Sequence, residues 1–149
     1  MKVAVMYSGG KDSSQAIKWC LDNNHEIVVL IAVKPKDTEA YLYHYATVEW
    51  TLLSAEAMGL PLIMVKSKKN GPDAEAKELE KVFERIKADA IVLGGVGLQK
   101  TQIKALEKVA KKFNTNVLVP YQNFTSEELL REEIKSGFDI RKTQVASDG

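Results

Sequence analysis

The chain has 149 residues, of which 45% are hydrophobic and 28% charged, the composition of a globular domain. Twenty-one basic and 20 acidic residues give a formal net charge of +1, which argues against bulk nucleic acid or an acidic membrane surface as the main partner. The only cysteine, Cys20, excludes an intrachain disulfide and a thiolate metal cluster, and it fits a reducing compartment. No segment has the ~20 apolar residues of a membrane span, and the first apolar run is too short for a signal peptide, so we expect a cytoplasmic protein.

Short apolar runs alternate with segments of helical periodicity along the chain. In chain order, we predict a strand at 3–7, a helix between the turns 9–10 and 23–24, a strand at 27–33, a helix at 39–58 and a strand at 62–65. The second half is predicted to contain a helix at 76–86, a strand at 90–93, a helix at 103–113, a strand at 117–119 and a helix at 126–136. The last helix begins at a capping-box sequence, Thr125–Glu128.

Strict alternation of strand and helix indicates a doubly wound parallel α/β sheet of about five strands with helices on both faces. We expect one Rossmann-like domain over residues 1–149. Residues 140–145 look like a sixth strand, and no closing helix follows it. Either the chain ends on an edge strand, or it is the N-terminal part of a longer enzyme, which is the alternative we favour. An unpaired sixth strand would also favour a homo-oligomer or a pairing of domains.

The loop after the first strand, residues 7–14 (YSGGKDSS), has the residue types of a phosphate-binding loop. In an open parallel sheet, ligands bind beyond the carboxyl ends of the strands, where the winding reverses. Gly9 and Gly10 let backbone N–H groups approach an anion, and the following helix adds N–H donors and the positive end of its dipole. Further donors and one positive charge come from side chains of the same loop: Ser8, Ser13, Ser14 and Lys11.

Asp12 is the exception in this loop because it is acidic. A carboxylate repels a phosphate unless a cation lies between them, so we interpret Asp12 as a Mg²⁺ ligand, direct or through water. The alternative is an ordinary strand-to-helix turn in which Asp12 is the helix N-cap. A Walker A loop is excluded because aspartate follows Lys11, and the near match to a dinucleotide fingerprint at residues 95–100 lacks its third glycine.

Three other places hold candidate residues. Gly94 and Gly95 close the fourth strand, which should flank the first across the switch point, and two glycines there would let a ribose or an α-phosphate approach the backbone. The alternative is a plain strand-ending turn. Lys100 could reach the α-phosphate or simply lie exposed. The helix at 39–58 offers residues that could line an acceptor pocket or merely belong to an amphipathic helix: Glu39, Tyr43 and His44.

The segment SGGKDS between a strand and a helix resembles the PP-loop of the N-type ATP pyrophosphatases, which have the adenine nucleotide α-hydrolase fold. In that family the loop grips the β- and γ-phosphates, and the enzyme transfers AMP to an acceptor oxygen and releases pyrophosphate. The resemblance implies an adenine site formed by backbone near Ala32 and Val33, with Lys11 as added charge at the phosphates. It implies pyrophosphate and Mg²⁺ contacts from five residues: Ser8, Gly9, Gly10, Asp12 and Ser13.

A narrower similarity covers nearly the whole chain. The segments EAYLYH (39–44), MGLPL (58–62) and LGG (93–95) are similar to the corresponding segments of diphthine–ammonia ligases. Those enzymes adenylate the diphthine carboxylate on elongation factor 2, and ammonia then forms the amide. This sequence contains nothing that matches the glycine- and glutamate-rich motif of the family's C-terminal region.

The leading hypothesis is an ATP- and Mg²⁺-dependent ligase that forms AMP and pyrophosphate, with Lys11 and Asp12 as its catalytic residues. The resemblance implies elongation factor 2 and ammonia as partners. One alternative is another AMP-forming PP-loop enzyme, such as an RNA-modifying one, although the near-zero net charge counts against it. The other alternative is a non-catalytic module that binds adenine nucleotides without hydrolysing them.

Overall fold

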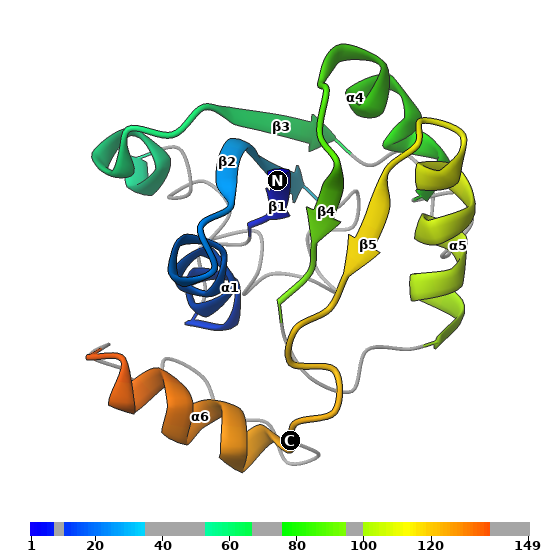
Figure 1. Cartoon of the computed structure of the whole chain (residues 1–149). Helices are drawn as coiled ribbons and strands as arrows, with labels where there is room; N and C mark the ends of the chain where they lie inside the picture. The colour runs from blue at the N-terminus through cyan, green and yellow to red at the C-terminus, as the bar shows by residue number, and fades with distance from the viewer. Residues whose placement is uncertain (8–10, 35–52, 67–75, 95–99, 138–149) are drawn as a thin grey trace.

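Five parallel strands form one sheet in the computed structural model, which describes residues 1–7, 11–34, 53–66, 76–94 and 100–137. The strands are β1 (Lys2–Met6), β2 (Glu26–Lys34), β3 (Leu62–Lys66), β4 (Ala90–Val92) and β5 (Asn116–Leu118). Their order across the sheet is β3-β2-β1-β4-β5, and every neighbouring pair is parallel (Figure 1). The five predicted strands are confirmed, as is the predicted position of the fourth strand beside the first.

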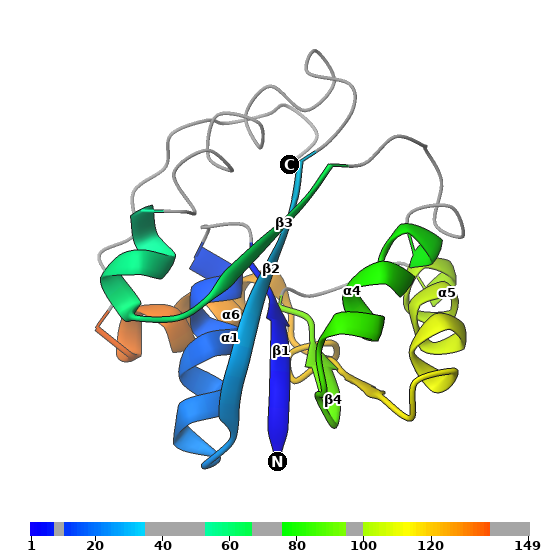
Figure 2. The same cartoon turned by 90° about the horizontal axis from the view of Figure 1, so that it is seen from above.

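Helices cover both faces of this sheet (Figure 2). The labelled helices are α1 (Lys11–Asp22), α4 (Glu80–Arg85), α5 (Lys100–Lys111) and α6 (Ser126–Lys135). On one face, α1 and a helical segment at 53–58 pack on the sheet, and α6 packs against α1. On the other face, α4 and α5 pack on the sheet and on each other. The doubly wound architecture that the sequence predicts is therefore confirmed.

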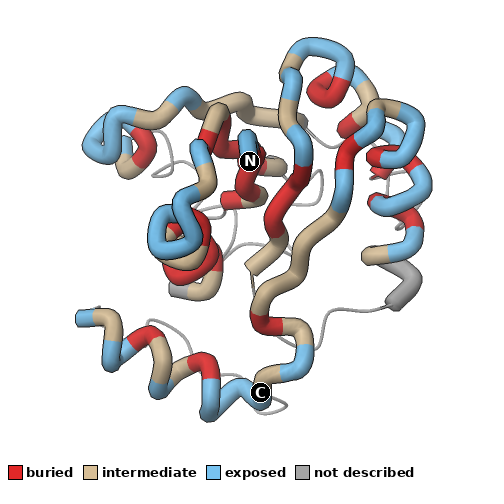
Figure 3. Tube along the Cα trace, in the orientation of Figure 1, coloured by how far each residue is buried: buried red, intermediate tan, exposed pale blue. Residues whose placement is uncertain are grey.

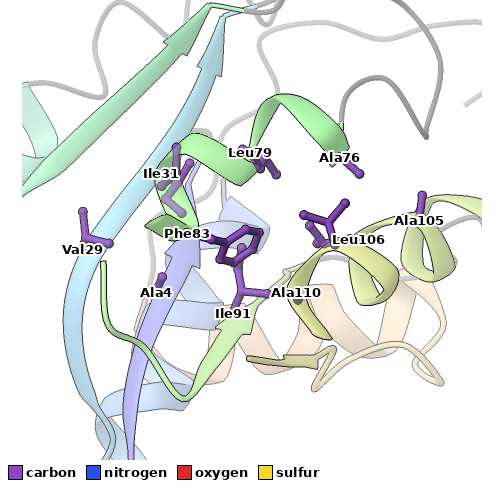
Figure 4. Close-up of a cluster of buried hydrophobic side chains, with 12 residues drawn as sticks. Ala4, Val29, Ile31, Ala76, Leu79, Phe83, Ile91, Ala105, Leu106 and Ala110 are labelled. Atoms are coloured by element: carbon purple, nitrogen blue, oxygen red, sulfur yellow. The ribbon is translucent and has the colours of Figure 1, made fainter. Parts of the chain in front are cut away.

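Two hydrophobic cores lie on the two faces because successive side chains of a strand point in opposite directions. In β1, Val3 belongs to the core that also contains Cys20 of α1. The next residue, Ala4, belongs to the core under α4 and α5, with Phe83 and Leu106 (Figure 4). Buried residues accordingly occur on the central strands and on the inward sides of the helices (Figure 3). Since β1 is covered on both sides, its carboxyl end is held at the centre of the sheet edge.

Several predicted boundaries have the expected backbone geometry. Asn24 after α1 and Gly59 after the segment 53–58 have φ angles of 59° and 71°, the left-handed region that ends helices. The capping box of α6 is formed: the Glu128 N–H donates to the Thr125 hydroxyl and the Thr125 N–H donates to Oε1 of Glu128, both at 3.1 Å. Local sequence therefore determines where these helices begin and end.

One predicted helix differs from the structure. The segment 76–86 is interrupted at Leu79, so that α4 begins only at Glu80. The Leu79 N–H donates to the Ala76 carbonyl and the Val82 N–H donates to the Leu79 carbonyl, a three-residue spacing that tightens the turn. Most of the predicted helix 39–58 and the strand-like segment 140–145 lie outside the described residues. None of the described helices is long and apolar enough to cross a membrane.

Candidate functional site

The carboxyl ends of β1, β2 and β4 meet at one edge of the sheet. The Tyr7 N–H donates to the Ile31 carbonyl at 2.8 Å, which continues the β1–β2 pairing beyond β1. On the other side of β1, Val5 is the register partner of Val92. The chain winds from β1 to β3 in one direction, and β4 and β5 lie on the other side of β1. This edge is thus the switch point at which open α/β sheets bind ligands.

Helix α1 begins at this edge, immediately after the predicted phosphate loop. It starts at Lys11, which places Asp12 inside the first turn and not at the N-cap position. The Asp12 and Ser14 residues are half-buried, and Ser13 is 7% exposed. The first N–H groups of a helix have no partner within the helix, and its dipole is positive at that end. The start of α1 therefore lies where the sequence places the phosphate loop, and phosphate binding there stays a prediction.

Gly94, which follows β4, packs against this first turn. A Cβ atom at Gly94 would lie 2.6 Å from the carbonyl oxygen of Asp12 and 3.1 Å from Cα of Ser13. We predicted that a glycine here leaves room for a ribose or an α-phosphate. The structure gives a different reason for this glycine, because the backbone of α1 fills the space next to its Cα. The contact brings the end of β4 to the phosphate-loop helix, and a nucleotide contact at Gly94 stays a prediction.

The predicted adenine-binding segment lies at the same edge. Ala32 is fully buried and Val33 is half-buried, and both are near the end of β2. They pair with Met64 and Val65 of β3. The end of β2 lies between β1 and β3, so this backbone is on the same side of the switch point as β1, and β4 is on the other side. Its contact with adenine stays a prediction.

Much of the predicted site lies outside the described residues. For Lys11 and Lys100 the structure describes the backbone alone, at the first positions of α1 and α5. The phosphate and substrate contacts assigned to all of these residues remain predictions. The predicted positions that the structure does not describe are Ser8, Gly9, Gly10, Gly95, Glu39, Tyr43 and His44.

The described residues fit a metal that arrives with a nucleotide. Within the described part of the chain, no three His, Cys, Asp or Glu side chains are grouped closely enough to hold a metal ion. Mg²⁺ in nucleotide sites is commonly bound by one or two carboxylates, with phosphate oxygens and water as the other ligands. Asp12 at the start of α1 supplies one such carboxylate. Its role as a ligand of a phosphate-bound Mg²⁺ stays a prediction.

Cys20, Trp19 and His25 make packing contacts at or beyond the second half of α1. Cys20 lies in the core, and burial raises the pKa of its thiol to about 11, so it is unsuited to nucleophilic chemistry near neutral pH. The Trp19 and His25 rings pack with centroids 5.4 Å apart. The N-terminal amino group lies 3.4 Å from Nδ1 of His25. These residues lie away from the start of α1.

A buried polar contact near the site was not predicted from the sequence. Nε2 of Gln15 in α1 donates a hydrogen bond of 3.2 Å to the hydroxyl of Tyr121, which follows β5. Both residues are buried, at 3% and 6% exposure. Burial raises the pKa of Tyr121 and the Gln15 hydrogen bond opposes that rise, so the hydroxyl stays protonated at neutral pH. No local sequence signal could have paired two residues so far apart in the chain.

Comparison with known proteins identifies relatives of this chain. A family profile described as "Diphthamide synthase N-terminal domain" matches residues 1–117. The diphthine–ammonia ligase of Bos taurus is 31% identical over 170 aligned positions, covering 100% of this chain and 63% of that protein. The Homo sapiens diphthine–ammonia ligase is 29% identical with the same coverage. The chain thus spans less than two thirds of the length of these curated relatives.

Solved structures share the fold. A predicted subunit of tRNA methyltransferase from Methanocaldococcus jannaschii has a TM-score of 0.54 and 20% identity, with 99% of this chain and 83% of that chain covered. The U34-tRNA thiolase NcsA of Methanococcus maripaludis has a TM-score of 0.55 and 18% identity, with 93% and 59% covered. At these identities the likeness concerns the fold alone.

Proposed function

The chain belongs to the diphthamide synthase N-terminal domain family, and from this premise we propose that it binds ATP with Mg²⁺ and cleaves it at the α-phosphate, as the nucleotide-binding domain of a diphthine–ammonia ligase. The proposed acceptor is the diphthine carboxylate of elongation factor 2, and the proposed nitrogen donor is ammonia. The diphthine–ammonia ligases of Bos taurus and Homo sapiens are longer than this chain, which covers 63% of their length. The activity of those whole proteins is a proposal for this chain.

The observation that carries this proposal is the close approach of Gly94 to Asp12 and Ser13. It places the end of β4 directly against the helix that follows the SGGKDS loop, at the switch point of the sheet. A nucleotide held by its phosphates at the start of α1 would thus have its ribose side toward β4 or β2. The fold and the loop sequence support the same site independently.

Each proposed role follows from residue chemistry. The N–H groups at the start of α1 and the Lys11 charge are proposed to neutralise the β- and γ-phosphates. Asp12 is proposed to hold Mg²⁺, which supplies further charge neutralisation on phosphate oxygens when bound. The one thiol in the chain is buried in the core and is not proposed as a nucleophile. Positioning and electrostatics are proposed to supply the rate enhancement.

The proposed reaction has two steps. A carboxylate oxygen of the acceptor attacks the α-phosphorus, and the bond from this phosphorus to the oxygen bridging to the β-phosphorus breaks, so that pyrophosphate leaves. The product of this step is an acyl adenylate. Ammonia then attacks the acyl carbon, AMP leaves, and the nitrogen loses a proton to give the amide.

The test is AMP formation by this chain and two matched variants. The reaction would contain ATP, Mg²⁺, ammonium and diphthine-bearing elongation factor 2. We expect Asp12→Ala to abolish AMP formation, because the proposed metal ligand is lost. Asp22→Asn is the control: Asp22 lies at the other end of α1, 60% exposed, in an ion pair with Lys18 that contributes little to stability. Wild-type turnover by Asp12→Ala would refute the site assignment.

The same assay separates the alternatives. AMP and pyrophosphate that form only with the factor support the ligase and show that these residues suffice. Binding of ATP without any product supports a nucleotide-binding module. AMP formation that depends on RNA instead of the factor supports another member of the PP-loop class.

A further inference from the structure

The segment between β5 and α6 is fixed to the helix that carries the proposed phosphate site. In Figure 1 this segment leaves the carboxyl end of β5 and leads to α6, which lies beside α1. Two contacts order this segment. The rings of Tyr121 and Phe124 pack edge to face with their centroids 5.1 Å apart, and the Thr125 capping box begins α6. The buried hydrogen bond from Gln15 to Tyr121 joins the segment to α1.

Gln15 is close to the proposed site in the helix itself. It lies three positions after Asp12, so the two side chains are neighbours along the surface of α1. Gly94 packs against the backbone of the same first turn, at Asp12 and Ser13. The start of α1 is therefore held from two directions, by the end of β4 and by the segment after β5.

The Gln15 amide depends on this contact. Its side chain is 3% exposed, and among the described residues none donates to its Oε1 atom. The Tyr121 hydroxyl is thus the partner that the structure describes for a buried amide. Removing the hydroxyl would leave that amide without a partner in the described structure. The loss of such a buried hydrogen bond destabilises a protein more than the loss of a solvent-exposed one, because water cannot replace the missing partner.

We propose that Tyr121 is a positioning residue for the nucleotide site, acting through Gln15 to hold the first turn of α1 in the arrangement that binds ATP. The inference rests on the function proposed above and extends it to a residue that does not touch the nucleotide. If ATP binds only those molecules in which the first turn of α1 keeps this arrangement, the apparent affinity falls in proportion to the fraction of molecules that keep it. Loss of one buried hydrogen bond is expected to weaken ATP binding about three- to tenfold.

The test compares two variants that each delete one buried hydroxyl. Tyr121→Phe keeps the ring and removes the contact to Gln15. Thr115→Val is the control. Thr115 is also a buried residue, at 7% exposure, and its hydroxyl lies 3.2 Å from the carbonyl oxygens of Ala88 and Phe113, just before β5 at the amino edge of the sheet. Binding of an ATP analogue that resists cleavage between the α- and β-phosphates is measured with Mg²⁺ by calorimetry, and thermal unfolding is measured alongside.

We expect both variants to lower the unfolding midpoint and only Tyr121→Phe to weaken binding of the analogue. A second measurement uses Gln15→Met and the double variant Gln15→Met/Tyr121→Phe. If the two residues act through one hydrogen bond, the double variant binds the analogue about as weakly as either single variant, because the effects are not additive. This also keeps the test decisive if one single variant folds poorly.

Three results overturn the inference. Unchanged affinity in Tyr121→Phe does so while leaving the proposed function intact, provided that the wild-type chain binds the analogue. Equal weakening of analogue binding in Tyr121→Phe and Thr115→Val would show that Tyr121 supports the fold in general and has no specific part in positioning the nucleotide site. If the wild-type chain itself does not bind the analogue, the proposed function fails, and the inference fails with it.

Discussion

Gly94 and Asp12 pack backbone against backbone, although they are far apart in the sequence. A Cβ atom at position 94 would lie 2.6 Å from the Asp12 carbonyl oxygen, a separation that Cβ atoms do not adopt. This contact couples β4 to the first turn of α1. The geometry of the proposed phosphate site therefore depends on a residue outside the phosphate loop.

Replacing this glycine is expected to damage both stability and ATP binding. In Gly94→Ala, the backbone of α1 or the end of β4 must shift, at a cost of about 1–3 kcal/mol in the free energy of unfolding. The shift moves the start of α1, so affinity for ATP should fall with it. Urea unfolding and calorimetric titration with ATP and Mg²⁺ measure the two effects.

Gly59→Ala is the matched control for that substitution. Gly59 has a φ of 71° and open space where the methyl group of an alanine would lie, so alanine there costs about 1 kcal/mol through backbone strain alone. Its affinity for ATP should equal that of the wild type. If both alanine variants lose affinity equally, the contact between β4 and α1 has no special part in nucleotide binding.

The assignment of Asp12 to Mg²⁺ predicts a metal dependence that one substitution removes. ATP binding by the wild-type chain should weaken when Mg²⁺ is removed with EDTA, because the bridge between the carboxylate and the phosphates is lost. Asp12→Asn should bind ATP with much less dependence on Mg²⁺, and Asp22→Asn should retain the dependence. Calorimetric titrations with and without Mg²⁺ test this, and an unaltered metal dependence in Asp12→Asn contradicts the assignment.

Cys20 should make the folded state sensitive to alkaline pH. Burial raises the pKa of this thiol from 9.0 to about 11. When the pKa of a group is higher in the folded state than in the unfolded state, the group contributes fully to the free energy of unfolding at pH values below its unfolded pKa. This contribution is lost as the pH rises through the folded pKa. The free energy of unfolding should therefore fall between pH 9 and pH 11, with Cys20 contributing up to about 2–3 kcal/mol of the change.

The variant Cys20→Ala isolates this contribution. It should be less stable at neutral pH because a buried side chain becomes smaller, and its stability should fall less steeply over the same alkaline range. Urea unfolding at several pH values measures both slopes. Parallel curves for the two proteins would show that Cys20 does not ionise in this range or does so equally in both states.

The capping box should account for a measurable part of the stability of α6. Thr125→Ala removes the hydroxyl that accepts from the Glu128 N–H, and we expect a loss of about 1 kcal/mol. Ser126→Ala is the control, since Ser126 is exposed at the first position of the helix. Chemical unfolding of the two variants decides the matter, and equal losses would mean that the cap contributes nothing specific.

The sequence predicted those features that depend on local pattern. Apolar runs identified all five strands, Asn24 and Gly59 marked helix ends, and the Thr125–Glu128 spacing marked the start of α6. The position of the fourth strand beside the first followed from the winding rule for parallel sheets. The location of the proposed site was predicted for the same reason.

The sequence did not predict features that arise from tertiary contacts. Gly94 was predicted to close the fourth strand, but the sequence does not reveal that the backbone of α1 fills the space beside this glycine. The hydrogen bond between Gln15 and Tyr121 depends on how the segment after β5 reaches α1, which no local pattern encodes. In α6, Glu133 is fully buried while the adjacent Ile134 is 58% exposed, the reverse of what hydrophobicity alone predicts.

The central claim is that ATP is cleaved at its α-phosphate, and the most direct measurement follows the radiolabelled γ-phosphate of ATP. The chain would be incubated with this ATP, Mg²⁺, ammonium and diphthine-bearing elongation factor 2, and the labelled products separated by thin-layer chromatography. We predict that the label appears in pyrophosphate, with one AMP formed for each pyrophosphate. Label in inorganic phosphate, with ADP as the other product, would contradict the claim.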